Sequence, residues 1–194
     1  TVLSRGLGDV YKRQKSFNLK NVQKGAAVFD LKRFNWVSSQ HLAKLNDDAF
    51  IEAIHPFMED EGIDDVAPNY KEILIAMRTS KTNLKEIAYA TRPFFFELEE
   101  YDEKGVNKFL KGSLETLTFA LETLSKISEW NETELDMALI NVRDYFNLPI
   151  PKVNQPMRIA LVGSTISPSL GLTLELFGKE KSLERIKKAI DFIS

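Results

Sequence analysis

The sequence predicts a mainly α-helical protein, and three observations support this prediction. Beyond residue 40, apolar residues recur at steps of three and four, the spacing that places them on one face of a helix. No alternating apolar and polar run of any length follows that point, so strands are not expected there. Residues that start helices, such as Asn and Ser, and glycines that end them punctuate the same stretch. The 194 residues can bury the core of one large domain or two small ones.

The bulk composition excludes several classes of protein. A content of 43% hydrophobic and 28% charged residues is ordinary for a globular chain, so disorder is not expected. No apolar run approaches the roughly 20 residues that a bilayer crossing needs. The absence of cysteine excludes disulfides and thiolate metal sites and suits a cytoplasmic protein. His41 and His55 are too poorly accompanied for a zinc centre, so we expect neither a metal nor a membrane partner.

The beginning of the chain stands apart from the rest. The first fourteen residues end in a stretch that resembles the translation of a transposon-end adapter used in preparing DNA libraries. We therefore treat residues 1–14 as a non-native tail and exclude them from the fold. From Ser16 to Trp36 the pattern is mixed, with residues 28–30 expected as a short extended piece before a helix. We expect Phe29 and Trp36 to fill a core junction rather than to stack on bases.

Helices are expected in order along the remaining chain. Apolar spacing predicts helical structure from Ser38 to Met58, and Pro68 is expected to open the next helix. Asn83 is expected to cap a helix that Pro93 kinks or ends. Two apolar stripes predict two further helices: Leu114, Leu117, Leu121 and Leu124, then Leu135, Leu139, Val142 and Phe146.

The last forty residues read as three short helices joined by tight corners. Pro156 suits a first helical turn, where its missing N–H would have had no partner. Gly163 suits the left-handed position that closes this helix. Ser167 is then expected to cap a second helix with Pro168 at its first position, before Gly178 ends it.

The corner between the first two of these helices is a candidate binding site. Gly163, Ser164, Ser167 and Pro168, with Arg158 one helix back, make it small, rigid and rich in hydrogen-bond donors. Such donors can meet the edges of unstacked bases. Helix capping alone is the other interpretation of Ser167 and Pro168, and the two roles can coexist.

Two motifs carry a resemblance to a known family. Residues 156–180 fit the pattern P-x-R-x-A-L-T-G … [ST]-P-x-L-x-x-x-L-x-x-L-G-K-E, with Val162 where Thr is usual. Residues 28–36, VFDLKRFNW, resemble A-V-F-D-x-x-K-L-N-W, although Ser38–Ser39 replaces the usual Asn-Gly. Both patterns belong to bacterial-type glutamyl-tRNA synthetases of class I, and the resemblance spans about residues 17–194.

The resemblance implies a fold and a role. It implies the C-terminal part of a synthetase: a curved stack of helices that binds the anticodon, preceded by a remnant of the stem-contact region. The implied boundaries are 15–46 for the remnant and 47–95 and 96–194 for two subdomains. The intact enzyme would ligate glutamate to tRNA(Glu) with ATP, and we expect a monomer. The H-I-G-H-like and K-M-S-K-S-like elements of class I catalysis are absent, so this part should hold no cofactor and be inactive alone.

The resemblance also implies contacts with tRNA. Arg158, Ser167, Pro168 and Leu170 match family residues around the second and third anticodon bases, where Pro168 and Leu170 give an apolar wall. Either Arg78 or Lys81 matches a residue facing the first base, and Arg is favoured because its planar fork discriminates base edges. The full anticodon-binding set so implied is Arg78, Lys81, Arg158, Gly163, Ser164, Ser167, Pro168 and Leu170. Lys179, Lys181 and Arg185 are candidate contacts to the tRNA backbone.

The net charge of −2 is unevenly distributed along the chain. Residues 47–65 carry eight acidic side chains and no Lys or Arg, whereas residues 150–194 carry seven basic and four acidic ones. A basic face could orient a polyanion. A helical protein-interaction scaffold without RNA binding is the alternative, with the acidic segment and apolar stripes docking a partner. A helical enzyme is a further rival, but no nucleophile–base set supports it.

Overall fold

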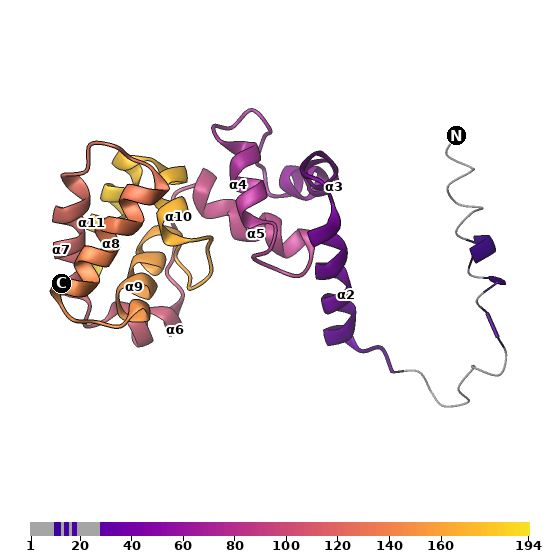
Figure 1. Cartoon of the computed structure of the whole chain (residues 1–194), viewed down its shortest axis with the longest axis horizontal. Helices are drawn as coiled ribbons and strands as arrows, with labels where there is room; N and C mark the ends of the chain where they lie inside the picture. The colour runs from indigo at the N-terminus through magenta and orange to yellow at the C-terminus, as the bar shows by residue number, and fades with distance from the viewer. Residues whose placement is uncertain (1–9, 13, 16, 19–27) are drawn as a thin grey trace. The chain divides into compact units, whose positions relative to one another are not determined.

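The regular structure of the described part of the chain is entirely helical, which confirms the predicted fold class (Figure 1). The computed structural model describes residues 10–12, 14–15, 17–18 and 28–194. The chain divides into two compact units, residues 1–31 and 32–194, and each is considered by itself.

The first unit contains little that the structure describes. Residues 10–12 and 14–15 are helical and exposed. The expected non-native tail lies mostly outside the described residues and stays a prediction. Val28, Phe29 and Asp30 lie in neither a helix nor a strand, so the expected extended piece does not form regular structure.

The second unit begins with α2 (Leu31–Lys44), α3 (Asp47–Asp60), α4 (Tyr70–Met77) and α5 (Leu84–Phe95). Asn46 caps α3, since its side-chain oxygen accepts a hydrogen bond from the Ala49 N–H at 2.8 Å. Asn83 caps α5 in the same way, accepting from the Glu86 N–H at 2.9 Å, as the sequence predicted. Helix α5 packs on both α3 and α4.

Two sequence-based expectations for this region were wrong. The start of α2 was not one of them, because a helix was expected after residues 28–30 and α2 begins at Leu31. Trp36 was expected in a core but is 62% exposed, and Phe29 is also exposed. Helix α4 begins at Tyr70, two residues after the predicted start at Pro68, following Asn69 in the left-handed conformation.

The middle of the second unit contains α6 (Glu103–Gly105), the π-helix η2 (Val106–Leu110), α7 (Leu114–Ser125) and α8 (Glu132–Tyr145). The predicted stripes supply the core of α7 and α8. Leu117, Leu124, Leu135 and Leu139 are buried, whereas Leu114 is exposed at the start of its helix. The π-helix was not predicted, because its apolar residues follow no period that distinguishes it from an α-helix.

The last three helices are α9 (Ile150–Val162), α10 (Leu170–Phe177) and α11 (Lys179–Ile193). Their number and order match the prediction, but two of their starts do not. Helix α9 begins six residues before Pro156, with Pro149 at its N-cap and Pro156 buried inside it. Helix α10 begins at Leu170 after Ser169, so Ser167 and Pro168 lie in the corner itself.

The terminal helices pack closely against the rest of the second unit. Helix α10 packs on α8, and α11 packs on α7 and α9. In the described part of the chain, no helix combines the length and apolar character that crossing a membrane requires.

Candidate nucleic-acid interface

The corner between α9 and α10 is held against a distant segment by its glycine. Gly163 adopts the left-handed conformation, with φ of 73°, and its N–H donates to the Ile159 carbonyl, as predicted for the end of a helix. Its own carbonyl accepts a hydrogen bond from the Asp102 N–H at 2.7 Å. A Cβ atom at this position would lie only 2.9 Å from the Glu100 carbonyl oxygen. Only glycine therefore allows this close approach of two backbones.

Arg158 and Ser167 form the polar centre of the corner. The Arg158 Nε donates to Ser167 Oγ at 3.1 Å, and Nη2 donates to the Pro168 carbonyl at 3.4 Å. Thr173 Oγ1 lies 3.1 Å from Ser167 Oγ and supports it from α10. Ser167 thus orients a guanidinium instead of capping a helix.

The Arg158 guanidinium lacks a counter-ion. Among the described residues, no carboxylate oxygen lies within 4.0 Å of it. Partial burial lowers the pKa of Arg158, because desolvation disfavours its charged form. The side chain is neither fully buried nor neutralised, and its corner neighbours from 164 to 169 are partly or fully exposed. The arrangement leaves a positive charge and free donors beside an open surface.

A groove of about 730 Å³ is lined in part by the same corner. One wall comes from α5 and the segment just before its cap, through Lys81, Tyr89 and Arg92. The opposite wall comes from the corner, through Gly163 and Ser164. The structure therefore brings the predicted residue Lys81 into the same groove as Gly163 and Ser164, which lie about eighty positions later in the sequence.

The groove also has an acidic rim. The segment between α5 and α6 and the start of α6 contribute five carboxylate side chains to its lining: Glu97, Glu99, Glu100, Asp102 and Glu103. Asp102 is engaged in capping, accepting from the Gly105 N–H at 2.7 Å. The lining is thus mixed in charge, and a polyanion would be repelled from this rim.

Tyr89, Arg92 and Phe96 form an aromatic and cationic stripe along α5. Their spacing of three and four places them on one face of the helix and its C-cap. The Arg92 guanidinium carbon lies 5.9 Å from the centre of the Tyr89 ring and 5.2 Å from that of Phe96. Its Nη1 also pairs with Glu61 at 2.9 Å. Sequence analysis did not single out Tyr89 or Arg92, although this helical spacing was a usable signal.

Arg78 is held away from the groove. Its Nη1 donates to the Leu45 carbonyl at 3.2 Å, and its Nη2 forms an ion pair with Asp47. The guanidinium carbon lies 5.0 Å from the Phe50 ring centre, and the side chain is only 16% exposed. Of the two residues considered for the first base, Lys81 therefore lines the groove and Arg78 joins α4 to the start of α3.

The candidate backbone contacts are turned toward the protein. Lys179 Nζ donates to the Ile127 carbonyl at 2.6 Å, and Lys181 Nζ donates to the Phe94 carbonyl at 3.0 Å. Arg185 is 2% exposed, so it cannot reach a phosphate and is removed from the interface. Leu170 is also 2% exposed and backs the corner from inside rather than presenting an open apolar wall. Pro168 remains at the surface of the corner, partly exposed.

Metal-ligating side chains do not cluster in the described part of the chain, where no group of three or more His, Cys, Asp or Glu residues could hold an ion.

Comparison with known proteins identifies the family. A family profile described as "Anticodon binding domain" matches residues 49–190. The glutamate–tRNA ligase 1 of Caldanaerobacter subterraneus is 32% identical over 192 residues, covering 95% of this chain and 40% of that protein. The glutamate–tRNA ligase of Legionella pneumophila is 31% identical over 180 residues, covering 92% and 38%. The chain thus spans about two fifths of the length of these curated relatives.

Solved structures show the same fold. A glutamate–tRNA ligase from Elizabethkingia meningosepticum, crystallised in complex with its amino acid, matches with a TM-score of 0.73 at 23% identity, covering 92% of this chain and 36% of that chain. A glutamate–tRNA synthetase from Elizabethkingia anophelis matches with a TM-score of 0.70 at 23% identity, covering 90% and 34%. Because the profile covers most of its length, the chain belongs to the anticodon-binding domain family.

Proposed function

We propose that this chain recognises the anticodon of tRNA(Glu) as part of a longer glutamate–tRNA ligase. The family profile supports anticodon binding, and the names of the curated relatives support the choice of tRNA. The observation that carries the proposal is the solvent-open corner between α9 and α10, with the unneutralised Arg158 beside it. The intact enzyme would ligate glutamate to tRNA with ATP, in the cytoplasm and as a monomer.

The proposed contacts follow from the donors at the corner. Ser167 and Pro168 already orient the Arg158 guanidinium, so the side chain loses less conformational entropy when RNA binds. A guanidinium can donate two hydrogen bonds to a base edge. Ser164 and Lys81 would donate from the two walls of the groove, where Tyr89, 66% exposed, offers a stacking surface.

The acidic rim would orient the RNA within this site. Phosphates would be repelled by Glu99, Glu100 and Glu103, whereas unpaired bases carry no charge and can enter the groove. We therefore propose that the loop binds with its bases toward the groove and its phosphates away from residues 97–103. A scaffold that docks an apolar protein segment is less well supported, because this groove carries both cations and carboxylates.

Substitution of Arg158 tests the proposal. The affinity of each variant is measured by titration with an anticodon stem-loop RNA that carries the tRNA(Glu) anticodon. Loss of a base-reading guanidinium costs about 1–3 kcal/mol, so R158A should weaken binding by roughly 5- to 150-fold. R158K should restore little of this loss, because an ammonium cannot reproduce the planar fork.

Arg143 offers a matched control on another helix. It pairs with Asp144 near the end of α8 and lines neither groove wall. R143A should bind the RNA with the affinity of the unmodified chain. Equal affinities for R158A and R143A would remove the corner from the binding site.

A further inference from the structure

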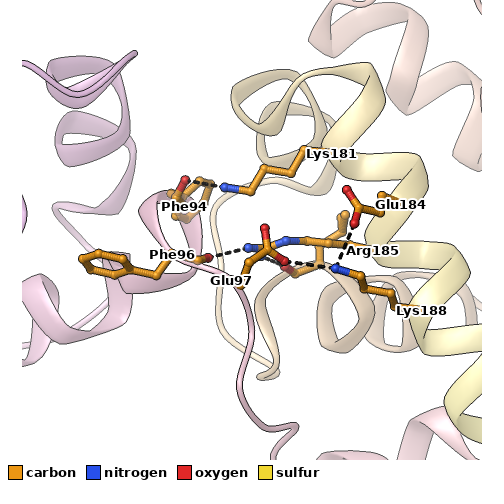
Figure 2. Close-up of polar contacts among 8 residues, drawn as sticks. Phe94, Phe96, Glu97, Lys181, Glu184, Arg185 and Lys188 are labelled. Atoms are coloured by element: carbon orange, nitrogen blue, oxygen red, sulfur yellow. Dashed lines mark hydrogen bonds and ion pairs between the residues drawn. The ribbon is translucent and has the colours of Figure 1, made fainter.

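Two cations of α11 bind the end of α5 in a buried junction (Figure 2). Lys181 Nζ donates to the Phe94 carbonyl at 3.0 Å, and Arg185 Nη2 donates to the Phe96 carbonyl at 2.7 Å. Arg185 Nη1 donates in addition to the Leu161 carbonyl. The guanidinium carbon also lies 4.5 Å from the centre of the Phe177 ring.

Arg185 is neutralised by helix ends rather than by a carboxylate. Among the described residues, no carboxylate oxygen lies within 4.0 Å of its guanidinium. Phe96 is the C-cap of α5, and Leu161 lies in the last turn of α9. The last carbonyls of a helix lack partners within it and together carry about half a negative charge. Two helix ends thus provide Arg185 with acceptors and a compensating negative potential.

Other charged groups lie at the edge of the junction. Burial lowers the pKa of Arg185 and of Lys181, because both cations lose hydration. Glu97 partly offsets this for both, and at the exposed edge it pairs with Lys188 Nζ at 3.2 Å (Figure 2). Lys188 pairs in addition with Glu184 at 2.8 Å. The junction therefore has Arg185, bonded to two carbonyls, at its buried centre and the ion pairs of Lys188 at its exposed edge.

The junction connects the two walls of the groove. Helix α5 carries Tyr89 and Arg92, and α9 leads two residues beyond Leu161 into Gly163 and the corner. One guanidinium that bonds to the ends of both helices restricts how α5 can turn relative to α9. The planar fork makes this restriction directional, because its two donating nitrogens are fixed with respect to each other.

We propose that Arg185, assisted by Lys181, is a positioning residue that sets the spacing of the groove walls and thereby the discrimination between anticodon bases. This inference rests on the proposed function only for its effect on RNA; its effect on wall spacing stands independently. Arg185 touches no RNA in this scheme. Its removal should therefore change selectivity more than the general, salt-dependent attraction to RNA.

The first readout is a distance between the walls. The chain contains no cysteine, so K85C on α5 and K152C on α9 introduce unique spin-label sites at exposed positions. The unmodified junction should give one narrow distance distribution by pulsed electron paramagnetic resonance. R185K keeps the charge but reaches one carbonyl only, so its distribution should broaden or shift. K187A removes an exposed cation of the same helix and should leave the distribution unchanged.

The second readout is selectivity. The ratio of affinities for stem-loops with the tRNA(Glu) anticodon and with changed anticodon bases should fall by roughly threefold or more in R185K. The slope of affinity against salt should stay constant, because no phosphate contact is lost. K187A should keep the unmodified ratio.

The outcomes separate the two proposals. A folded R185K with an unchanged distance distribution and ratio would overturn the positioning role. Absence of selectivity in the unmodified chain would overturn the proposed function, while the distance distribution would still decide whether Arg185 holds the walls. If R185K fails to fold, R185Q serves instead, because its amide nitrogen can donate to one carbonyl but cannot bridge Leu161 and Phe96. A folded R185Q with an unchanged distance distribution and ratio would overturn the positioning role.

Discussion

Two arginines show that the partners of a guanidinium decide its role. Arg158 was predicted to read the second and third anticodon bases, and Arg78, with Lys81 as its alternative, was predicted to face the first base. Arg78 is occupied by Asp47 and a carbonyl, whereas Arg158 donates to a hydroxyl and a carbonyl. Asp47 lies 31 residues from Arg78, so this pairing arises from the packing of α3 and α4 and not from any local motif.

Arg78 should therefore matter for stability more than for RNA binding. R78M removes a charge-assisted hydrogen bond at a mostly buried position, so the free energy of unfolding should fall by about 1–3 kcal/mol. Urea denaturation measures this fall, and R143M, at a pair between adjacent residues, should cost less. An R78M chain that unfolds like the unmodified one but loses base discrimination would instead place Arg78 in direct contact with RNA.

The ion pair between Glu97 and Lys188 gives a pH-dependent contribution to stability. The hydrogen bond from Lys188 lowers the pKa of Glu97 below its ordinary value of 4.5. A carboxyl whose pKa is lowered on folding stabilises the protein above its unfolded-state pKa, and this contribution disappears as the pH falls through the folded-state pKa.

E97Q should accordingly lower the melting temperature slightly at neutral pH. The difference from the unmodified chain should close as the pH falls below 4.5. Thermal unfolding followed by circular dichroism across this range checks the prediction, with E115Q on α7 as an exposed control. A difference that persists undiminished in acid would mean that the carboxylate charge is not its origin.

At the scale of elements, the caps at Asn83 and Gly163 were predicted correctly, whereas the cap at Ser167 and the helix start at Pro156 were not. Asn83 caps the start of α5 and Gly163 caps the end of α9, as predicted, because caps depend on a few neighbouring backbone groups. Pro156 was expected to start a helix, yet it lies buried within α9. Tertiary packing overrides the local preference there, and packing partners cannot be read from nearby residues.

Gly163 should be required for both the fold and the site. Alanine would strain the left-handed backbone and place its Cβ against the Glu100 carbonyl. Gly112 is the matched control, since its φ is 86° but a Cβ added there would meet no atom within 4 Å. G112A should cost about 1–2 kcal/mol for conformation alone, and G163A should cost more. Urea denaturation of both variants measures the two costs.

RNA binding distinguishes these variants further. G163A displaces the corner from residues 100–102 and should weaken binding of the anticodon stem-loop, whereas G112A should not. Equal costs in stability and in affinity for the two variants would contradict the proposed close approach of the corner to this segment.

At the scale of the whole molecule, the charge pattern was predicted only in outline. The excess of cations in residues 150–194 left two interpretations open, a basic face that orients RNA or a merely solvated surface. Lys181 and Arg185 instead bond to carbonyls of Phe94 and Phe96, about ninety positions earlier in the chain. Composition can count charges, but it cannot show that an arginine serves as the counter-ion of helix ends. The acidic rim beside the groove was hidden for the same reason.

Neutralising the acidic rim should strengthen RNA binding but leave the orientation of the bound RNA less well defined. E99Q combined with E100Q removes two charges from the groove lining, so affinity for any stem-loop should rise by roughly two- to fivefold at low salt. Selectivity for the tRNA(Glu) anticodon should fall, because the phosphates gain an alternative position. The rise should shrink at high salt, where screening is stronger.

E115Q combined with E122Q provides the control for this change. Both residues are exposed on α7 and neither lines the groove. Their neutralisation should alter affinity less and leave selectivity intact. Identical effects of the two double variants would show that net charge, rather than the rim, governs RNA binding.

The most direct test compares two RNAs with the unmodified chain. One anticodon stem-loop carries the tRNA(Glu) anticodon, and the other differs only in its second and third anticodon bases. Titrated at the same salt concentration, the first should bind at least roughly tenfold more tightly, because each misread base costs on the order of 1–3 kcal/mol. Equal affinity for the two RNAs would show that the corner at Arg158 does not read bases.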